Sequence, residues 1–145
     1  MSLVDAATRP RVQDWREAVL ASAQLLVDMG SATQTYPQAC VDVVHEHGPY
    51  IVLTPGLALV HARPESGGVG LGVAVLRLDG PVEFGHEAND PVDVLVAFSS
   101  PDQSAHVDTL STLAKALGTG LADRLREAGD ADRLRQLVTE ALDAG

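Results

Sequence analysis

Residues 48–65, with the sequence GPYIVLTPGLALVHARPE, contain two short apolar runs followed by a histidine that enters a polar turn. The runs are residues 50–53 and 57–60, and a Pro-Gly pair separates them. Short apolar runs bounded by turn residues predict buried strands. Because His61 follows the second run directly, this stretch predicts a histidine at the carboxyl end of a strand.

Helical patterns precede this stretch. Between residues 14 and 29, apolar residues recur at steps of three and four, which predicts an amphipathic helix. A second helix is predicted to begin near Thr35, with Pro37 in its first turn, and to end at Gly48. The chain therefore enters its first predicted strands from two consecutive helices.

Two longer strands and a helical C-terminal third are predicted after the stretch. Residues 69–78 and 91–99 are apolar runs, and residues 79–81, Asp-Gly-Pro, predict a turn between them. From residue 101 onward the apolar residues follow helical spacing, with a break at Gly129-Asp130 and a last helix predicted at 131–142. Helices before and after buried strands predict a single α/β domain over residues 1–145, a small mixed sheet with helices on both faces. We expect residues 1–12 to be loosely ordered.

Composition narrows the classes of function. The chain of 145 residues carries 20 acidic and 10 basic residues, a formal net charge of −10. This balance argues against nucleic-acid binding and against docking on anionic membranes, both of which need clustered Lys and Arg. No apolar run approaches the roughly 20 residues of a spanning helix, and the N-terminus lacks a signal-peptide pattern, so we expect a cytoplasmic protein without membrane insertion. The single cysteine, Cys40, is expected to be a small buried apolar residue.

His61 has two interpretations at this stage. On position alone, packing is the commoner role of a partly buried imidazole. However, the polar segment after it, with Arg63, Glu65 and a Gly-Gly pair, is of the kind where functional residues concentrate. A second histidine, His106, lies at the predicted start of the helix after residue 101, where helix dipole and free N–H groups favour an anion. If the two face each other, one imidazole can attack a phosphoryl group while the other donates a hydrogen bond to it.

Other chemistries find less support. His45 and His47 lie two residues apart on a predicted helix and point about 200° apart, so they cannot chelate a metal from one face. No Gly-x-Ser-x-Gly motif of a serine hydrolase occurs. The segment GGVGLG falls in a strand pattern, whereas a nucleotide-binding loop lies between a strand and a helix. We therefore expect no metal and no organic cofactor.

Three blocks of the sequence resemble a known family. PYIVLTPGLALVHARPE, FGHEANDPVDVLVAFSSPD and HVDTLSTLAKAL are similar to the enzyme IIA component of the bacterial phosphoenolpyruvate-dependent sugar phosphotransferase system. The resemblance is to the mannitol/fructose-type superfamily and, within it, to the ascorbate-type branch. It covers nearly the whole chain and implies the enzyme IIA mannitol/fructose-type fold.

The resemblance also implies roles for individual residues. His61 matches the histidine that accepts a phosphoryl group from the phosphocarrier HPr and passes it to a cysteine of enzyme IIB. His106 matches the histidine that stabilises this phosphoryl group, and Arg63 is implied as an electrostatic partner of phosphate or carrier. The family commonly has Pro before its active histidine, where Val60 stands here. Many relatives carry an arginine that supports the phosphohistidine near the position of His45, so the resemblance makes His45 a candidate binding residue, a weak substitute when neutral.

The implied function is that of a cytoplasmic phosphocarrier, a phosphotransferase with a phosphohistidine intermediate, in the uptake of a sugar such as ascorbate. Two alternatives remain open at the level of sequence. One is an enzyme IIA-like regulatory domain that signals through its phosphorylation state. The other is a binding module that no longer takes phosphate. The apolar residues Leu57, Leu59 and Val60 are candidates for a partner-docking rim if they are exposed.

Overall fold

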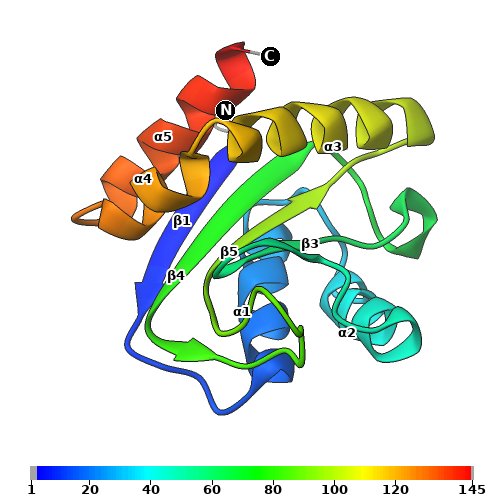
Figure 1. The fold of residues 1–145 in the computed structure, drawn as a ribbon. Helices are drawn as coiled ribbons and strands as arrows, with labels where there is room; N and C mark the ends of the chain where they lie inside the picture. The colour runs from blue at the N-terminus through cyan, green and yellow to red at the C-terminus, as the bar shows by residue number, and fades with distance from the viewer. Residues whose placement is uncertain (1–2, 145) are drawn as a thin grey trace.

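The computed structural model describes residues 3–144, which form a five-stranded mixed sheet between two layers of helices (Figure 1). The order of the strands across the sheet is β1-β4-β5-β3-β2. The strands are β1 (Val4–Arg9), β2 (Val52–Thr54), β3 (Leu57–Val60), β4 (Gly72–Val82) and β5 (Val92–Ser99). The helices are α1 (Trp15–Asp28), α2 (Tyr36–His47), the 3-10 turn η1 (Pro64–Ser66), α3 (Gln103–Gly118), α4 (Leu121–Glu127) and α5 (Ala131–Ala144).

The predicted fold class is confirmed. Helices α1 and α2 lie on one face of the sheet, and α3, α4 and α5 lie on the other (Figure 1). The sheet is mixed because β3 runs parallel to β5 and β1 runs parallel to β4, whereas β4 and β5 are antiparallel. Within residues 3–144, none of the helices combines the length and the apolar character needed to cross a membrane.

The strand beside His61 has both faces buried, and its residues alternate between two cores. Leu57 and Leu59 pack in the core under α3, α4 and α5, whereas Ala58 and Val60 pack in the core under α1 and α2. Side chains of a strand alternate between faces with a period of two. The residue that follows Val60 is therefore directed toward the α3 side of the sheet.

This burial corrects one expectation from the sequence. Leu57, Leu59 and Val60 are fully buried, so they cannot form an exposed rim for a partner protein. They pair with β5 and fill the two cores instead, because β3 is an inner strand between β5 and β2.

The N-terminal segment is also different from its prediction. The expectation of loose order over residues 1–12 is wrong for Val4–Arg9, which form the edge strand β1 in register with β4, from Val4 beside Val73 to Arg9 beside Leu78. The hydrogen-bond partners of β1 come from a distant part of the chain, so the local sequence gives no sign of them. Residues 1, 2 and 145 lie outside the described residues.

The boundaries of β4 differ from the predicted strand at 69–78. The segment before Gly72 is a loop, and the predicted turn at 79–81 lies inside β4, which continues to Val82. The N–H of Gly80 donates to the carbonyl of Pro10 at 2.8 Å, and the register with β5 shifts between Arg77 and Val82. The chain thus passes through Asp-Gly-Pro as an irregular extended segment, since a neighbouring segment satisfies its backbone.

Candidate active site

His61 lies directly after the last residue of β3 and is half-buried. Its Nδ1 lies 3.0 Å from the carbonyl oxygen of Leu59. A carbonyl oxygen only accepts hydrogen bonds, so Nδ1 carries the proton of the neutral ring. This leaves the lone pair of Nε2 free, and the imidazole is held in the tautomer of a nucleophile.

The His61 ring contacts two other rings on the α3 side of the sheet, and the three rings also contact one another. It stacks on Phe98 of β5 with ring centroids 5.2 Å apart and planes inclined by 21°. The centroid of His106, in the first turn of α3, lies 5.6 Å from that of His61 and 5.2 Å from that of Phe98. The structure therefore brings together His61 and His106, the two histidines singled out in the sequence.

The start of α3 is fixed by its cap. Asp102 precedes the helix in an extended conformation, and its carboxylate accepts the N–H of Ala105 at 2.8 Å. The cap sets the first turn, from which His106 projects toward the end of β3. The Nδ1 atom of His106 is enclosed and has no hydrogen-bond partner among residues 3–144, which leaves Nε2 as the ring nitrogen able to meet a ligand.

Both imidazoles are biased toward the neutral form. Burial lowers the pKa of His61 below its usual value, and the neighbouring His106 lowers it further, while the bond to the Leu59 carbonyl acts in the opposite direction. Burial also lowers the pKa of His106, with Glu65 acting against the shift. Neutral rings suit a nucleophile and a hydrogen-bond donor near pH 7, because an unprotonated Nε2 is needed for attack on phosphorus.

The two histidines open into a polar cavity of about 470 Å³. Its walls include His47 from α2, Tyr50 from the next loop, and Gln103 from α3. The ring of Tyr50 meets His61 edge-on with centroids 6.3 Å apart, and His47 meets Tyr50 in the same way, also at 6.3 Å. The space beside His61 is thus large enough for a phosphoryl group and open to a donor.

Arg63 lines the same cavity, as its position two residues after His61 suggests. Its side chain is exposed and has no hydrogen bond or ion pair among the described residues. The carboxylate of Glu65, from the adjacent turn η1, also lines the cavity. An unpaired guanidinium at the rim is free to bind a phosphate dianion in a bidentate manner.

His45 is placed elsewhere. It is exposed on α2 and is not part of the cavity wall, whereas His47, two residues later, is. The helical rotation between the two side chains accounts for this difference, since only one of them can point toward β3. The structure therefore does not bring the candidate binding residue His45 to the site, and it adds His47.

Tyr36 was not identified as a site residue from the sequence. Its hydroxyl accepts the N–H of Ala62 at 3.0 Å and lies 2.8 Å from the carbonyl of Phe98. These contacts join residues far apart in the chain, so the local sequence pattern around Tyr36 does not predict them. The one sequence signal that could have drawn attention to Tyr36 is its residue type, because a tyrosine buried in a core needs hydrogen-bond partners for its hydroxyl.

The two glycines after His61, Gly67 and Gly68, are required by the close approach of neighbouring segments and by backbone conformation. A Cβ on Gly68 would lie 2.1 Å from the carbonyl oxygen of Ser100, and Gly67 has a φ of +135°. The carbonyl of Gly67 accepts the N–H of Thr33 at 2.8 Å. The loop after His61 is therefore packed between the start of α2 and the end of β5.

The block FGHEAND has a turn role at the opposite end of the sheet. The carboxylate of Asp90 accepts backbone N–H groups of Phe84, Gly85 and His86, and Nδ1 of His86 accepts those of residues 88 and 89. The Asn89 side chain donates to the carbonyl of Val52 at 3.1 Å. His86 is consequently occupied in the turn and lies outside the cavity of His61.

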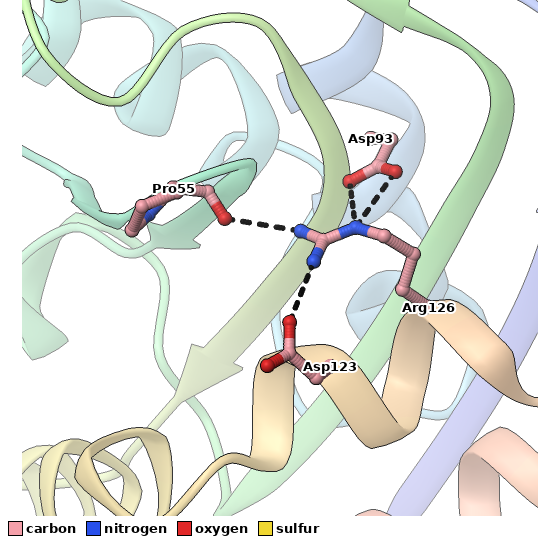
Figure 2. Close-up of polar contacts among 4 residues, drawn as sticks. All are labelled: Pro55, Asp93, Asp123 and Arg126. Atoms are coloured by element: carbon pink, nitrogen blue, oxygen red, sulfur yellow. Dashed lines mark hydrogen bonds and ion pairs between the residues drawn. The ribbon is translucent and has the colours of Figure 1, made fainter.

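Arg126 of α4 anchors the same end of the β3–β5 pair (Figure 2). Its Nε lies 2.9 and 3.0 Å from the two carboxylate oxygens of Asp93, and its Nη2 donates to the carbonyl of Pro55 at 3.0 Å. A third contact joins Nη1 to Asp123 at 3.1 Å. All three nitrogens of this guanidinium are thus engaged by the fold, which holds the side chain in a structural role.

Cys40 is buried, as expected. Burial raises the pKa of its thiol to about 12, so the thiol stays protonated and is a poor nucleophile. Among residues 3–144, no group of three or more His, Cys, Asp or Glu side chains is placed to hold a metal ion.

Comparison with known proteins identifies the family. The family model described as "Phosphoenolpyruvate-dependent sugar phosphotransferase system, EIIA 2" matches residues 4–141. The chain belongs to this enzyme IIA family. The resemblance seen in the sequence is thereby confirmed, and so is the enzyme IIA mannitol fold that it implied.

Individual enzyme IIA proteins support this result. The ascorbate-specific PTS system EIIA component of Shigella boydii is 45% identical over 94 residues, which make up 65% of this chain and 61% of that protein. The matched part thus spans 61% of the relative's length. The solution structure of the mannitol-specific cryptic phosphotransferase enzyme IIA CmtB from Escherichia coli has a TM-score of 0.80 at 27% identity and covers 97% of this chain and 92% of its own.

A third comparison concerns an assembly. The complex of enzyme IIAMTL and phosphorylated enzyme IIBMTL from Escherichia coli matches with a TM-score of 0.76 at 21% identity, covering 97% of this chain and 95% of that chain. At this identity the comparison supports the fold alone.

Proposed function

We propose that this enzyme IIA chain is a phosphocarrier that takes a phosphoryl group on Nε2 of His61 and passes it on in sugar uptake. The observation that carries the proposal is that the tautomer of His61 is fixed and that its ring lines an open cavity. Nδ1 of His61 is engaged with the carbonyl of Leu59, and Nε2 is left free beside His106. Membership of the enzyme IIA family supports the same role.

The transfer step needs only positioning and charge stabilisation from the protein. The lone pair of His61 Nε2 attacks the phosphorus of a phosphohistidine on the donor, and the donor's P–N bond breaks. The electron pair of that bond stays on the donor ring, which leaves as a neutral imidazole because its other nitrogen carries a proton. The His61 ring becomes a phosphorylated imidazolium whose Nδ1–H remains bonded to the Leu59 carbonyl.

His106 and Arg63 are proposed to stabilise the transferred group. His106 is close enough for its Nε2–H to donate to a phosphoryl oxygen on His61, and it has no competing partner among the described residues. Arg63 supplies a guanidinium that no carboxylate neutralises within residues 3–144. Groups placed in advance where negative charge gathers contribute strongly to such reactions. No metal or organic cofactor takes part in this scheme.

The proposed partners are HPr as donor and a cysteine of enzyme IIB as acceptor, on the cytoplasmic side of a sugar transporter. The IIB assignment is supported by the solved complex of a protein of the same fold with phosphorylated enzyme IIB. Ascorbate is the first transported substrate to test, because the Shigella boydii relative is named for it.

The test is phosphorylation in a defined mixture. The chain is incubated with phosphoenolpyruvate, enzyme I and HPr, and in parallel with phosphoramidate, a small chemical phosphoryl donor that needs no protein partner. We expect an acid-labile phosphate that is lost in His61→Ala and retained in His45→Ala, the matched control on the exposed face of α2. Absence of phosphate on the wild type with both donors would refute the proposal.

A second stage separates a carrier from a regulator. Addition of an ascorbate-type enzyme IIB should discharge the phosphorylated chain and produce phosphocysteine on enzyme IIB. A chain that accepts phosphate and keeps it in the presence of several enzyme IIB proteins would contradict the carrier role.

A further inference from the structure

We propose that Tyr36 is a positioning residue for this transfer, because its hydroxyl ties the backbone after His61 to the backbone of Phe98 and so sets where the His61 ring lies. The inference rests on the proposed function and adds a residue to its site. Tyr36 is the first residue of α2 and lies outside the cavity wall, so it acts through its neighbours.

The hydroxyl of Tyr36 has backbone partners in Ala62 and Phe98, and the buried Cys40 thiol interacts with it as well. The hydroxyl accepts the N–H of Ala62 at 3.0 Å. It has one proton to donate, and the carbonyl of Phe98 at 2.8 Å is a closer acceptor than the carbonyl of Ala62 at 3.2 Å. Burial raises the pKa of Tyr36 well above its usual value, so the hydroxyl keeps this proton.

These bonds extend the β3–β5 pair beyond its last regular step. The parallel register ends with Val60 beside Ala97. Past that point, the Tyr36 oxygen connects a donor on the β3 side, Ala62, to an acceptor on the β5 side, Phe98. The Tyr36 oxygen therefore joins the two strands next to His61. Its donor, Ala62, follows His61 in the chain, and its acceptor is the backbone carbonyl of Phe98, the residue whose ring stacks on His61.

The position of Tyr36 is itself well determined. Its side chain is buried, with 1% exposure, and the loop after His61 packs on it. A Cβ on Gly67 would lie 3.2 Å from the Cβ of Tyr36 and 2.6 Å from Oγ1 of Thr33, so no larger residue fits between them. The start of α2 therefore acts as a fixed support for the His61 loop.

Correct placement matters because the reaction proceeds in line. A displacement of about 1 Å of a reacting group can cost on the order of 100-fold in rate. Without the hydroxyl, the N–H of Ala62 and the carbonyl of Phe98 lose a shared partner, and the loop can separate from β5. The His61 ring would then move off the face of Phe98 and gain solvent.

The variant Tyr36→Phe tests this, because it removes one oxygen atom and keeps the ring. We expect the rate of phosphorylation, from phosphoramidate and from phospho-HPr, to fall about tenfold. We also expect the pKa of His61, followed by NMR titration, to rise toward its usual value as the ring gains solvent. Val138→Ala, in the buried part of α5, is the control for general destabilisation and should change neither the rate nor the His61 titration.

The outcomes are separable. A wild-type chain that takes no phosphate would refute the proposed function, whereas an unchanged rate and His61 titration in Tyr36→Phe would refute the role of Tyr36. If Tyr36→Phe does not fold, amide exchange in the wild type decides the matter. We expect a strongly protected Ala62 N–H and a slowly exchanging Tyr36 hydroxyl proton, and a rapidly exchanging Ala62 N–H would overturn the inference.

Discussion

The two ends of the β3–β5 pair carry the same residue type in opposite states. At one end, the guanidinium of Arg126 is bound by Asp93, Asp123 and the Pro55 carbonyl (Figure 2). At the other end, Arg63 has no partner among residues 3–144, and Nε2 of His106, in the same cavity wall, has none either. The contrast assigns Arg126 a structural role and Arg63 a functional one, because polar groups that a fold leaves unpaired beside a cavity are available to a ligand.

The largest effect should come from the unpaired imidazole. His106→Ala removes the donor nearest to the His61 ring, and the phosphorylation rate should fall about 100-fold, as when a donor to a developing anion is deleted. Rapid-quench measurement of phosphate uptake checks this. His106→Gln keeps an N–H donor and should recover part of the rate; equal losses in both variants would show that the donor is not what matters.

A smaller effect is expected at Arg63. A charge-assisted bond to phosphate is worth about 1.5–3 kcal/mol, and the exposure of Arg63 favours the low end of that range, so Arg63→Ala should slow phosphorylation about tenfold. Since Arg63 is exposed and unpaired, the free energy of unfolding should stay within about 0.5 kcal/mol of the wild type. A variant that transfers phosphate normally, or one that loses stability instead, would break the contrast with Arg126.

Arg126→Ala should give the reverse pattern. It leaves the carboxylate of Asp93, which is 23% exposed, and the Pro55 carbonyl without their partner. Loss of such contacts costs about 1–3 kcal/mol of unfolding free energy. Urea denaturation measures this, while the phosphorylation rate of the folded variant should remain within about twofold of the wild type. A tenfold fall in rate would mean that the two ends are coupled.

The pH dependence should be the smallest effect. The pKa of His61 and that of His106 are lowered by burial, so the folded chain binds fewer protons than the unfolded chain below the usual histidine pKa of 6.5. Stability from these rings is therefore present above pH 6.5 and is lost as the pH falls through the lowered values, by at most about 1.4 kcal/mol per ring and pH unit. Denaturation at pH 5.5, 6.5 and 7.5 checks this. The loss should be smaller in the double variant His61→Ala, His106→Ala; an identical loss would assign it to other groups.

Much of the site could be predicted from sequence because it follows local periodicity. Leu57, Leu59 and His61 share one face of β3, and the alternating residues of β5 place Phe98 on that same face. A helix that starts soon after β5 brings His106 toward it. Strand alternation and a helix cap are properties of short segments, so their consequences can be deduced without a structure.

The parts that were missed depend on contacts between distant segments. The strand β1 exists because β4 offers it a partner, and Tyr36 matters because α2 places its hydroxyl between Ala62 and Phe98. The choice between His45 and His47 depended on the rotation of α2 about its axis, which packing against the sheet determines. Periodicity locates a helix, but it does not fix which exposed residue reaches a cavity.

The central claim is that Nε2 of His61 is the phosphoryl acceptor. It is tested most directly by NMR of the phosphorylated chain with ¹⁵N-labelled histidine, which reports the phosphorylated nitrogen through its coupling to phosphorus. The account predicts one phosphohistidine, at His61, with phosphorus on Nε2 and the proton retained on Nδ1 toward the Leu59 carbonyl. Phosphorus on Nδ1 of His61, or on any other histidine of the wild-type chain, would contradict it.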